Sequence, residues 1–242
     1  ILGRKETLVN MTGDFLRDFH QRSYRAENTV VSLAGSFRQE DLDQLRQRFS
    51  VLPPGAAREE ETALYRPAFV ATKKPIEQNH LLMAFPGLGY GSPKRFALQL
   101  LSTILGGGVS SRLFQTVREQ QGLCYSIYSY GASHRETGCF CIYTALNGDT
   151  EAKALETIRQ VVRDFKQNGP TQEELSRVRE QTKANVVMGM ESTQSRMSHS
   201  GRSLLFNGEI LSAEQLIAAY DAVTREDILA LAEEVFDWDQ LS

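Results

Sequence analysis

Two strand-like runs follow each other near the middle of the chain with no helix between them. The runs CYSIYSY (124–130) and GCFCIYTAL (138–146) are rich in β-branched and aromatic residues, and the segment ASHRET joins them. Such a pair predicts a β-hairpin. Consecutive strands favour an antiparallel sheet over a doubly wound parallel one. We therefore predict the fold class α+β, with an antiparallel sheet covered by helices.

Helix-start signals recur on both sides of this hairpin. Each is a Ser, Thr, Asp or Pro followed by apolar residues at helical spacing. They predict helices over 12–24, 36–49, 93–104 and 149–165, from 171 towards 205, and from 212 to before 224. The segment SRLFQTVREQ (111–120) predicts a short helix after the glycine-rich turn LGGGVSS. Two more strands are expected, over 28–34 and over 77–85, the second ending at Pro86-Gly87.

The stretch 52–67 (LPPGAAREEETALYRP) is the best candidate for a domain boundary. It holds three of the seven prolines, a glycine and a charge run without an apolar period. We expect 1–51 to be the tail of a first domain, 52–67 a linker and 68–242 a second domain. A surface loop inside one domain is the alternative. Because the chain opens at Ile1 without methionine, we expect it to continue upstream.

Segments at the two ends of the chain resemble each other at an offset of 212 residues, from Thr12 to Thr224. Both begin with a helix cap and share apolar spacing and a closing aromatic residue. Phe19 corresponds to Leu231, and Tyr24 to Phe236. An internal repeat is one explanation, and the general likeness of amphipathic helices is the other.

Composition excludes several partners. A formal net charge of −3 leaves no excess of Lys and Arg for a phosphate backbone, so nucleic acid is not expected. The apolar runs fall short of the roughly 18 residues that a membrane-spanning helix needs, so no membrane is expected either. Three cysteines are too few and odd in number for a disulfide framework, which favours a reducing, cytoplasmic location. An upstream targeting segment would change that assignment.

Arg118 and Tyr125 flank the Gly122 bend between the short helix and the first strand of the hairpin. A guanidinium and a phenol at these positions would project into a common space, and both donate hydrogen bonds suited to a peptide carbonyl. Ordinary structure offers another explanation. An arginine in the last helical turn interacts favourably with the helix dipole, and tyrosine packs well in strands.

The string SSRLFQTVREQQGLCYSIYS, with its glycine-rich lead-in and the following ETGCFCIYTAL, resembles the carboxyl-side half of insulinase-like zinc metallopeptidases. It is also similar to the mitochondrial processing peptidase group. The segments IEQNHLLMAFPG, FALQLLSTILGG and PTQEELSRVREQTKANVV stand in the order that this family shows, so the resemblance spans nearly the whole chain.

The resemblance implies two similar α+β domains, joined by a linker, that enclose a chamber. Zinc lies in the first domain, and the second supplies an Arg and a Tyr that match Arg118 and Tyr125 and bind the substrate backbone. Gly106, Gly107 and Gly108 match a loop that touches substrate in some relatives, although the loop is short here. The expected function is the substrate-binding portion of a zinc endopeptidase that cleaves unfolded or short peptides. The alternative is a non-catalytic partner or scaffold subunit.

The same resemblance implies that zinc belongs to the intact enzyme and not to this chain. The family binds zinc through H-x-x-E-H, and this string is absent, so the chain alone is not expected to be catalytic. Its expected partners are a peptide substrate and a zinc-bearing amino-terminal half, with a homodimer as a further option. Cys139-x-Cys141 is read as a pair of small buried residues, with soft-metal binding as the alternative.

Overall fold

The computed structural model describes residues 3–55 and 63–242, which form two compact units. One unit contains the described residues up to 55 together with 191–210, and the other contains 63–190 and 211–242. Part of the predicted linker, 56–62, lies outside the described residues. The domain limits drawn from the sequence stay a prediction.

The first unit is helical. Its elements are α1 (Lys5–Leu8), α2 (Gly13–Ser23), the 3₁₀ turn η1 (Ala26–Asn28), α3 (Gln39–Phe49) and α7 (Thr193–Asn207). The helix predicted from Thr12 is confirmed, because the Thr12 side chain accepts a hydrogen bond from the Phe15 N–H.

Two predictions in this unit are wrong. Residues 28–34 form no strand, because their extended backbone finds no partner strand within the described part of the chain, and a ladder needs one. The predicted cap at Ser36 is also misplaced. The helix begins at Gln39, and the Arg38 N–H donates instead to the Asp41 carboxylate at 2.8 Å.

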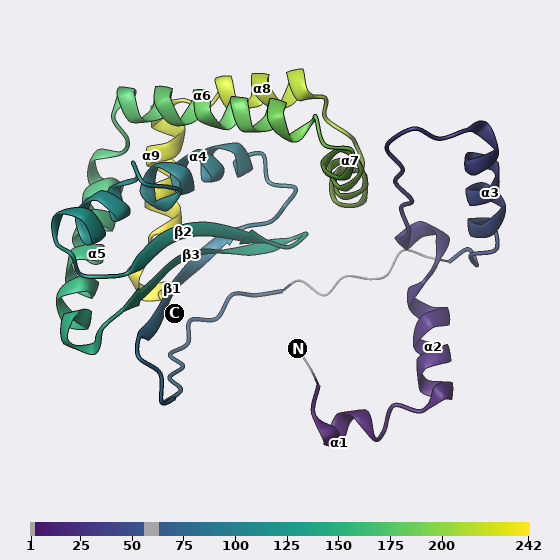
Figure 1. Ribbon diagram of the computed structural model, residues 1–242, viewed down its shortest axis with the longest axis horizontal. Coiled ribbons are helices and arrows are strands. Elements are labelled where there is room, and N and C mark those ends of the chain that lie inside the picture. Colours follow the sequence, from purple (N-terminus) through teal and green to yellow (C-terminus); the bar gives the residue numbers. More distant parts are fainter. Residues whose placement is uncertain (1–2, 56–62) are drawn as a thin grey trace. The chain divides into compact units, whose positions relative to one another are not determined.

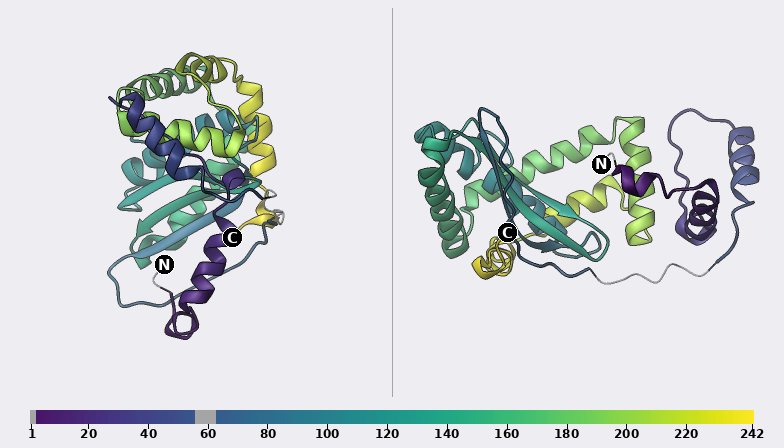
Figure 2. Two further views of the ribbon diagram at one scale, coloured as in Figure 1. Left: turned by 90° about the vertical axis from the view of Figure 1, so that its right-hand side faces the viewer. Right: turned by 90° about the horizontal axis from the view of Figure 1, so that it is seen from below.

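The second unit is built on a three-stranded antiparallel sheet in the order β1-β3-β2. Strand β1 is Asn79–Leu88, β2 is Ser126–Ser133 and β3 is Thr137–Leu146. The predicted hairpin is β2–β3, in which Tyr128 pairs with Tyr143. Helices cover one face of this sheet (Figures 1 and 2), so the α+β fold class is confirmed.

The sequence predicted that strand β1 ends at Pro86-Gly87. Strand β1 instead runs through both residues to Leu88. Strand β1 lies at an edge of the sheet, where an outward-facing N–H has no neighbouring strand to bond. Pro86, which lacks an N–H, is therefore tolerated there. On that outer side Ala84 exchanges two backbone hydrogen bonds with Ser242, at 2.8 and 2.9 Å. A Cβ on Gly87 would lie 2.6 Å from the Cys139 backbone, so only glycine permits this close pairing.

The helices of the second unit bury the core against the sheet. They are α4 (Arg95–Gly106), the π-helix η2 (Phe114–Gln120), α5 (Glu151–Asn168), α6 (Gln172–Gly189), α8 (Ala213–Asp221) and α9 (Arg225–Val235), with short 3₁₀ turns η3 (Gly148–Thr150) and η4 (Trp238–Gln240). Phe85, Phe140 and Phe236 are fully buried and pack edge to face, with ring centroids 5.3 to 5.4 Å apart.

The single helix predicted from Thr171 towards Leu205 is two helices. Its start is confirmed, with Thr171 and Glu174 forming a capping box. Helix α6 ends at Gly189, and the Ser192 side chain accepts from the Ser195 N–H to begin α7. A glycine followed by a new N-cap is a sufficient reason for this break.

The segments that resemble each other in sequence also coincide in structure. Helices α2 and α9 both have 11 residues and begin and end at the 212-residue offset, as do η1 and η4. Thr12 and Thr224 cap the two helices in the same way, by accepting from the N–H three residues ahead. The likeness therefore extends through a helix, its cap and the turn that follows.

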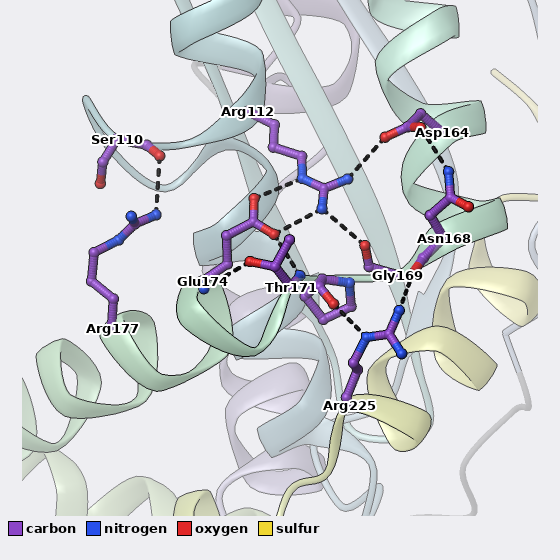
Figure 3. Close-up of polar contacts among 10 residues, drawn as sticks. Ser110, Arg112, Asp164, Asn168, Gly169, Thr171, Glu174, Arg177 and Arg225 are labelled. Carbon is purple, nitrogen blue, oxygen red and sulfur yellow. Dashed lines mark hydrogen bonds and ion pairs between the residues drawn. The ribbon is translucent and has the colours of Figure 1, made fainter.

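Arg112 is the centre of a polar network that joins the start of the η2 segment to the turn between α5 and α6 (Figure 3). Its guanidinium donates two hydrogen bonds to the Glu174 carboxylate, at 2.8 and 2.7 Å, and one to the Gly169 carbonyl at 2.9 Å. A further contact reaches Asp164 at 3.1 Å. The guanidinium also lies 4.9 Å from the centre of the Phe165 ring. Arg112 and Glu174 are each only 18% exposed, so water competes weakly for this pair.

The Glu174 carboxylate takes part in two interactions: it accepts hydrogen bonds from Arg112, and it also accepts one from the Thr171 N–H at 2.7 Å. Burial raises the pKa of Glu174, but the hydrogen bonds from Arg112 and Thr171 and the charge of Arg112 outweigh burial, and the pKa falls below its usual value. The hydrogen bonds to Glu174 conversely raise the pKa of Arg112. The pair is therefore ionised at neutral pH.

Helix α4 and strand β2 approach so closely at Gly106 that a side chain does not fit. An added Cβ would lie 2.4 Å from the Ser129 backbone nitrogen. The Ser129 hydroxyl donates to the Ser102 carbonyl of α4 at 2.9 Å, which fixes the contact. A Cβ on Gly108, two residues further on, would meet nothing within 4 Å.

We expect Gly106→Ala to lower the free energy of unfolding by about 1–3 kcal/mol, because α4 or β2 must move to admit the methyl group. Gly108→Ala is the matched control and should change it by less than about 0.5 kcal/mol. Urea denaturation followed by circular dichroism measures both. Equal stability of the two variants would contradict the close approach.

We expect Glu174→Gln to lower the free energy of unfolding by about 1–2 kcal/mol at pH 7, since the charge-assisted bonds from Arg112 are weakened. The lowered pKa means that the ionised carboxylate stabilises the fold above its ordinary pKa of 4.5. This contribution is lost as the pH falls through the folded-state pKa. Urea denaturation between neutral and acid pH should therefore show the difference from wild type shrinking. Glu173→Gln, at the neighbouring exposed carboxylate, should show no such trend.

Candidate functional site

Arg118 lies in the last turn of the π-helix η2. Its guanidinium carbon lies 4.7 Å from the centre of the Phe114 ring, four residues earlier. Within the described part of the chain the guanidinium makes no hydrogen bond or ion pair. The five N–H donors of Arg118 are therefore available to a ligand.

The turn after η2 brings Tyr125 next to Arg118. Gly122 has φ +62°, a conformation that glycine adopts without strain, and its N–H donates to the Arg118 carbonyl at 3.0 Å. Leu123 is buried, and its N–H donates to the Val117 carbonyl at 3.0 Å. Two residues later the Tyr125 N–H bonds the Ala145 carbonyl of β3 at 2.9 Å. The bend is thus fixed by backbone bonds on both sides.

Tyr125 is 71% exposed, and the Arg118 guanidinium lies 5.9 Å from the centre of its ring. This distance is at the outer limit of a cation–π contact. The structure therefore brings the two predicted residues together on one surface. Neither the Tyr125 hydroxyl nor the Arg118 guanidinium makes a hydrogen bond with the residues that the structure describes.

Arg118 and the glycine loop line a common open groove of about 470 Å³. Gly106, Gly107 and Gly108 line this groove together with Arg118 and Phe114. Strand β2 contributes its first residues, from Ser126 to Ser129. All the residues predicted for the site except Tyr125 border this groove.

Sequence reasoning missed two aromatic residues of this groove. Phe114 lies beneath the Arg118 guanidinium, and the Phe–Arg spacing of four residues on a helix was the available signal. Tyr128 lines the groove from β2 and packs against Tyr143 of β3, with ring centroids 4.9 Å apart. The Tyr143 hydroxyl in turn lies 2.6 Å from the His80 Nδ1. The rings of Tyr128, Tyr143 and His80 are brought together by the pairing of β1, β3 and β2, which could not be predicted from the sequence.

The arrangement can bind and polarise an oxygen. A guanidinium presents a fixed set of donors, and a neutral phenol presents one donor that follows an oxygen as negative charge develops on it. Ser126 and Ser129 are among the described residues that line this groove, but no His, Asp, Glu or Lys stands among them to activate a serine hydroxyl. Burial raises the pKa of the Cys124 thiol, although a hydrogen bond with Thr144 and the charge of Arg118 lower it, so Cys124 is a poorly reactive thiol.

The described residues contain no group of three His, Cys, Asp or Glu side chains that is arranged to hold a metal ion. Cys139 and Cys141 lie on β3, where Cys141 is buried. Burial raises the pKa of Cys141, which disfavours the thiolate that a soft metal needs. The described donors therefore do not fit a zinc site. Of the helices described, none combines the length and the apolar character needed to cross a membrane.

Comparison with known proteins identifies the family. The family described as the peptidase M16 inactive domain matches residues 10–182. The protein YmxG of Bacillus subtilis, named an uncharacterized zinc protease, is 35% identical over 99% of this chain and 59% of its own length. The uncharacterized zinc protease SCO5738 of Streptomyces coelicolor is 32% identical over 97% of this chain and 53% of its own length. The chain thus spans little more than half the length of these relatives.

Solved structures agree with this assignment. A peptidase M16 inactive domain from Pseudomonas fluorescens superimposes with a TM-score of 0.87 at 26% identity, over 99% of this chain and 58% of that one. A protease from Helicobacter pylori, at 19% identity, shares the fold with a TM-score of 0.83 over 99% of this chain and 60% of its own. The resemblance to insulinase-like zinc metallopeptidases is confirmed, and the chain belongs to the peptidase M16 inactive-domain family.

Proposed function

We propose that this chain is the substrate-binding, carboxyl-side portion of a zinc-dependent endopeptidase that cleaves unfolded or short peptides. One observation carries the proposal: among the described residues the guanidinium of Arg118 has no hydrogen-bond or ion-pair partner, and it lies beside the exposed side chain of Tyr125. Arg112, an arginine that stabilises the fold, has its donors paired with carboxylates and a carbonyl, whereas Arg118 has none paired among the described residues. An unpaired arginine next to a second donor is suited to a ligand oxygen.

In this role Arg118 binds a carbonyl of the peptide main chain, and Tyr125 donates to the oxygen on which negative charge develops. Both donors are held by the Gly122 bend before substrate arrives, so little reorganisation is needed. Neither residue accepts a proton or attacks the peptide. The reaction therefore needs groups outside this chain, and the names of the relatives support a zinc-bearing part of the same protein or of a partner.

The domain limits belong to the same proposal: 1–51 completes a zinc-bearing domain, 52–67 links it, and 68–242 forms the opposite wall of a closed chamber. A chamber of this kind admits extended chains and excludes folded ones. Cytoplasmic location and a homodimer are further parts of the proposal.

A second candidate is a non-catalytic subunit of a larger assembly. It is favoured by a specific likeness: a chain of complex III from Candida albicans shares the fold, with a TM-score of 0.80 at 17% identity. At this identity the likeness concerns the fold alone. Cleavage by the complete protein separates the two candidates, because a subunit without activity cleaves nothing.

We expect Arg118→Ala, in the complete polypeptide that contains this chain, to lower kcat/KM for an unstructured peptide by about 100- to 1,000-fold. Tyr125→Phe should lower it by about 10-fold or more, since one donor is removed and the ring is kept. A quenched fluorescent peptide, assayed with and without chelator, measures the effect.

Arg159→Ala is the matched control, because Arg159 is a partly exposed arginine on α5 whose nearest ion pair, with Glu156, is 4.0 Å long. It should leave kcat/KM unchanged. An active enzyme in which Arg118→Ala and Tyr125→Phe behave like this control would refute the proposed roles. A complete wild-type protein without chelator-sensitive cleavage would support the second candidate.

Metal analysis of the 242-residue chain, purified after exposure to zinc, should find far less than one zinc per chain. The physical reason is the lack of a three-donor group among the described residues. One stoichiometric zinc that survives gel filtration would show that this chain has a site of its own.

A further inference from the structure

A second groove of about 450 Å³ is lined mainly by residues of α4, α6 and β2. Helix α4 contributes Gln99 and Thr103, and helix α6 contributes Gln181 and Asn185. Nothing in the proposed function uses this groove. We call it the amide groove, after these three Asn and Gln side chains.

The lining of the amide groove is polar but uncharged. It contains hydroxyl and carboxamide side chains and no Lys, Arg, Asp or Glu. A neutral lining disfavours charged ligands such as phosphates, which need cations or helix N-termini. Each carboxamide offers both a donor and an acceptor, which is the complement of a peptide group.

Two of the carboxamides make no hydrogen bond within the described part of the chain. Gln181 and Asn185 are four residues apart on α6 and therefore lie on one face of that helix. Both are exposed, and neither side chain has a hydrogen-bond partner in the part of the chain that the structure describes. Gln99 differs, because its amide reaches Thr103 at 3.5 Å.

The amide groove adjoins the Arg118 groove. Gly107 and Ser129 line both, so the two grooves meet where the glycine loop passes the middle of β2. An extended chain that is bound at Arg118 and continues past Gly107 and Ser129 enters the groove that Gln181 and Asn185 line. An extended peptide rises about 3.3 Å per residue, so a peptide must exceed a minimum length to occupy both grooves.

We infer that the amide groove is a distal peptide-binding site, in which Gln181 and Asn185 hydrogen-bond the main chain of an extended substrate that is held at Arg118. This inference rests on the proposed function and adds to it. Recognition through main-chain groups does not depend on side-chain identity, so the site selects for extended conformation and length rather than for sequence.

The test is peptide binding by the complete polypeptide, measured by fluorescence anisotropy in chelator so that no turnover occurs. One probe is an unstructured peptide of about 16 residues, roughly 50 Å long when extended, and the other has about 6 residues. The double variant Gln181→Ala/Asn185→Ala should bind the long peptide about 5- to 30-fold more weakly and the short one unchanged. A scrambled long peptide should behave like the original.

Gln172→Ala is the matched control, since Gln172 is an exposed carboxamide on the same helix that lines neither groove. It should bind both peptides as wild type does. Main-chain recognition is tested with a long peptide N-methylated over its distal half. N-methylation should weaken binding to wild type but cause little further loss in the double variant, because both changes remove the same hydrogen bonds.

Equal binding of the long peptide by wild type and the double variant would overturn the inference. So would fully additive losses from N-methylation and the double variant, which would mean that the amides do not touch the main chain. These results are distinct from failure of the proposed function. If Arg118→Ala leaves turnover unchanged while the double variant still loses the long peptide, the role of Arg118 falls, and Gln181 and Asn185 bind the peptide without an anchor at Arg118.

Discussion

The ion pair between Arg112 and Glu174 is the interaction on which the arrangement of the second unit depends. Through one guanidinium it connects the start of η2, the end of α5 and the cap of α6. Both partners are largely buried, so the loss of either would leave a charge with little water to solvate it. Because η2 leads directly into the Gly122 bend, the position of Arg118 depends on this buried pair.

Two arginines on one short segment thus have opposite surroundings. Arg112 has its donors committed to carboxylates and a carbonyl and lies over the Phe165 ring. Arg118, six residues later, lies near the rings of Phe114 and Tyr125, and its donors are unpaired within the described part of the chain. The first arrangement gives rigidity, and the second leaves hydrogen-bonding capacity for another molecule. A rigid support below unpaired donors is what pre-organised binding of an oxygen requires.

The sequence was sufficient where local chemistry decides the structure. The caps at Thr12, Thr171 and Thr224 and the β2–β3 hairpin depend on neighbouring residues, and they were predicted correctly. The sequence was insufficient where contacts between segments far apart in the chain determine the structure. The run 28–34 has strand composition but no partner, and Pro86 remains in a strand because of its edge position. Arg118 and Tyr125 were predicted from resemblance and remain a prediction, whereas the places of Phe114 and Tyr128 in the groove became visible only in the fold.

The π-helix at Phe114–Gln120 has a consequence for how this segment tolerates changes in length. In an α-helix each residue turns the helix by about 100°, so a deletion rotates everything that follows. A π-helix holds a surplus residue, and losing one residue there restores α-helical geometry without breaking the segment. A deletion within η2 would therefore leave a folded protein whose guanidinium at 118 points elsewhere. The folding of this segment and the direction of its guanidinium can therefore change separately. Related chains can differ in where the guanidinium points while keeping the same core.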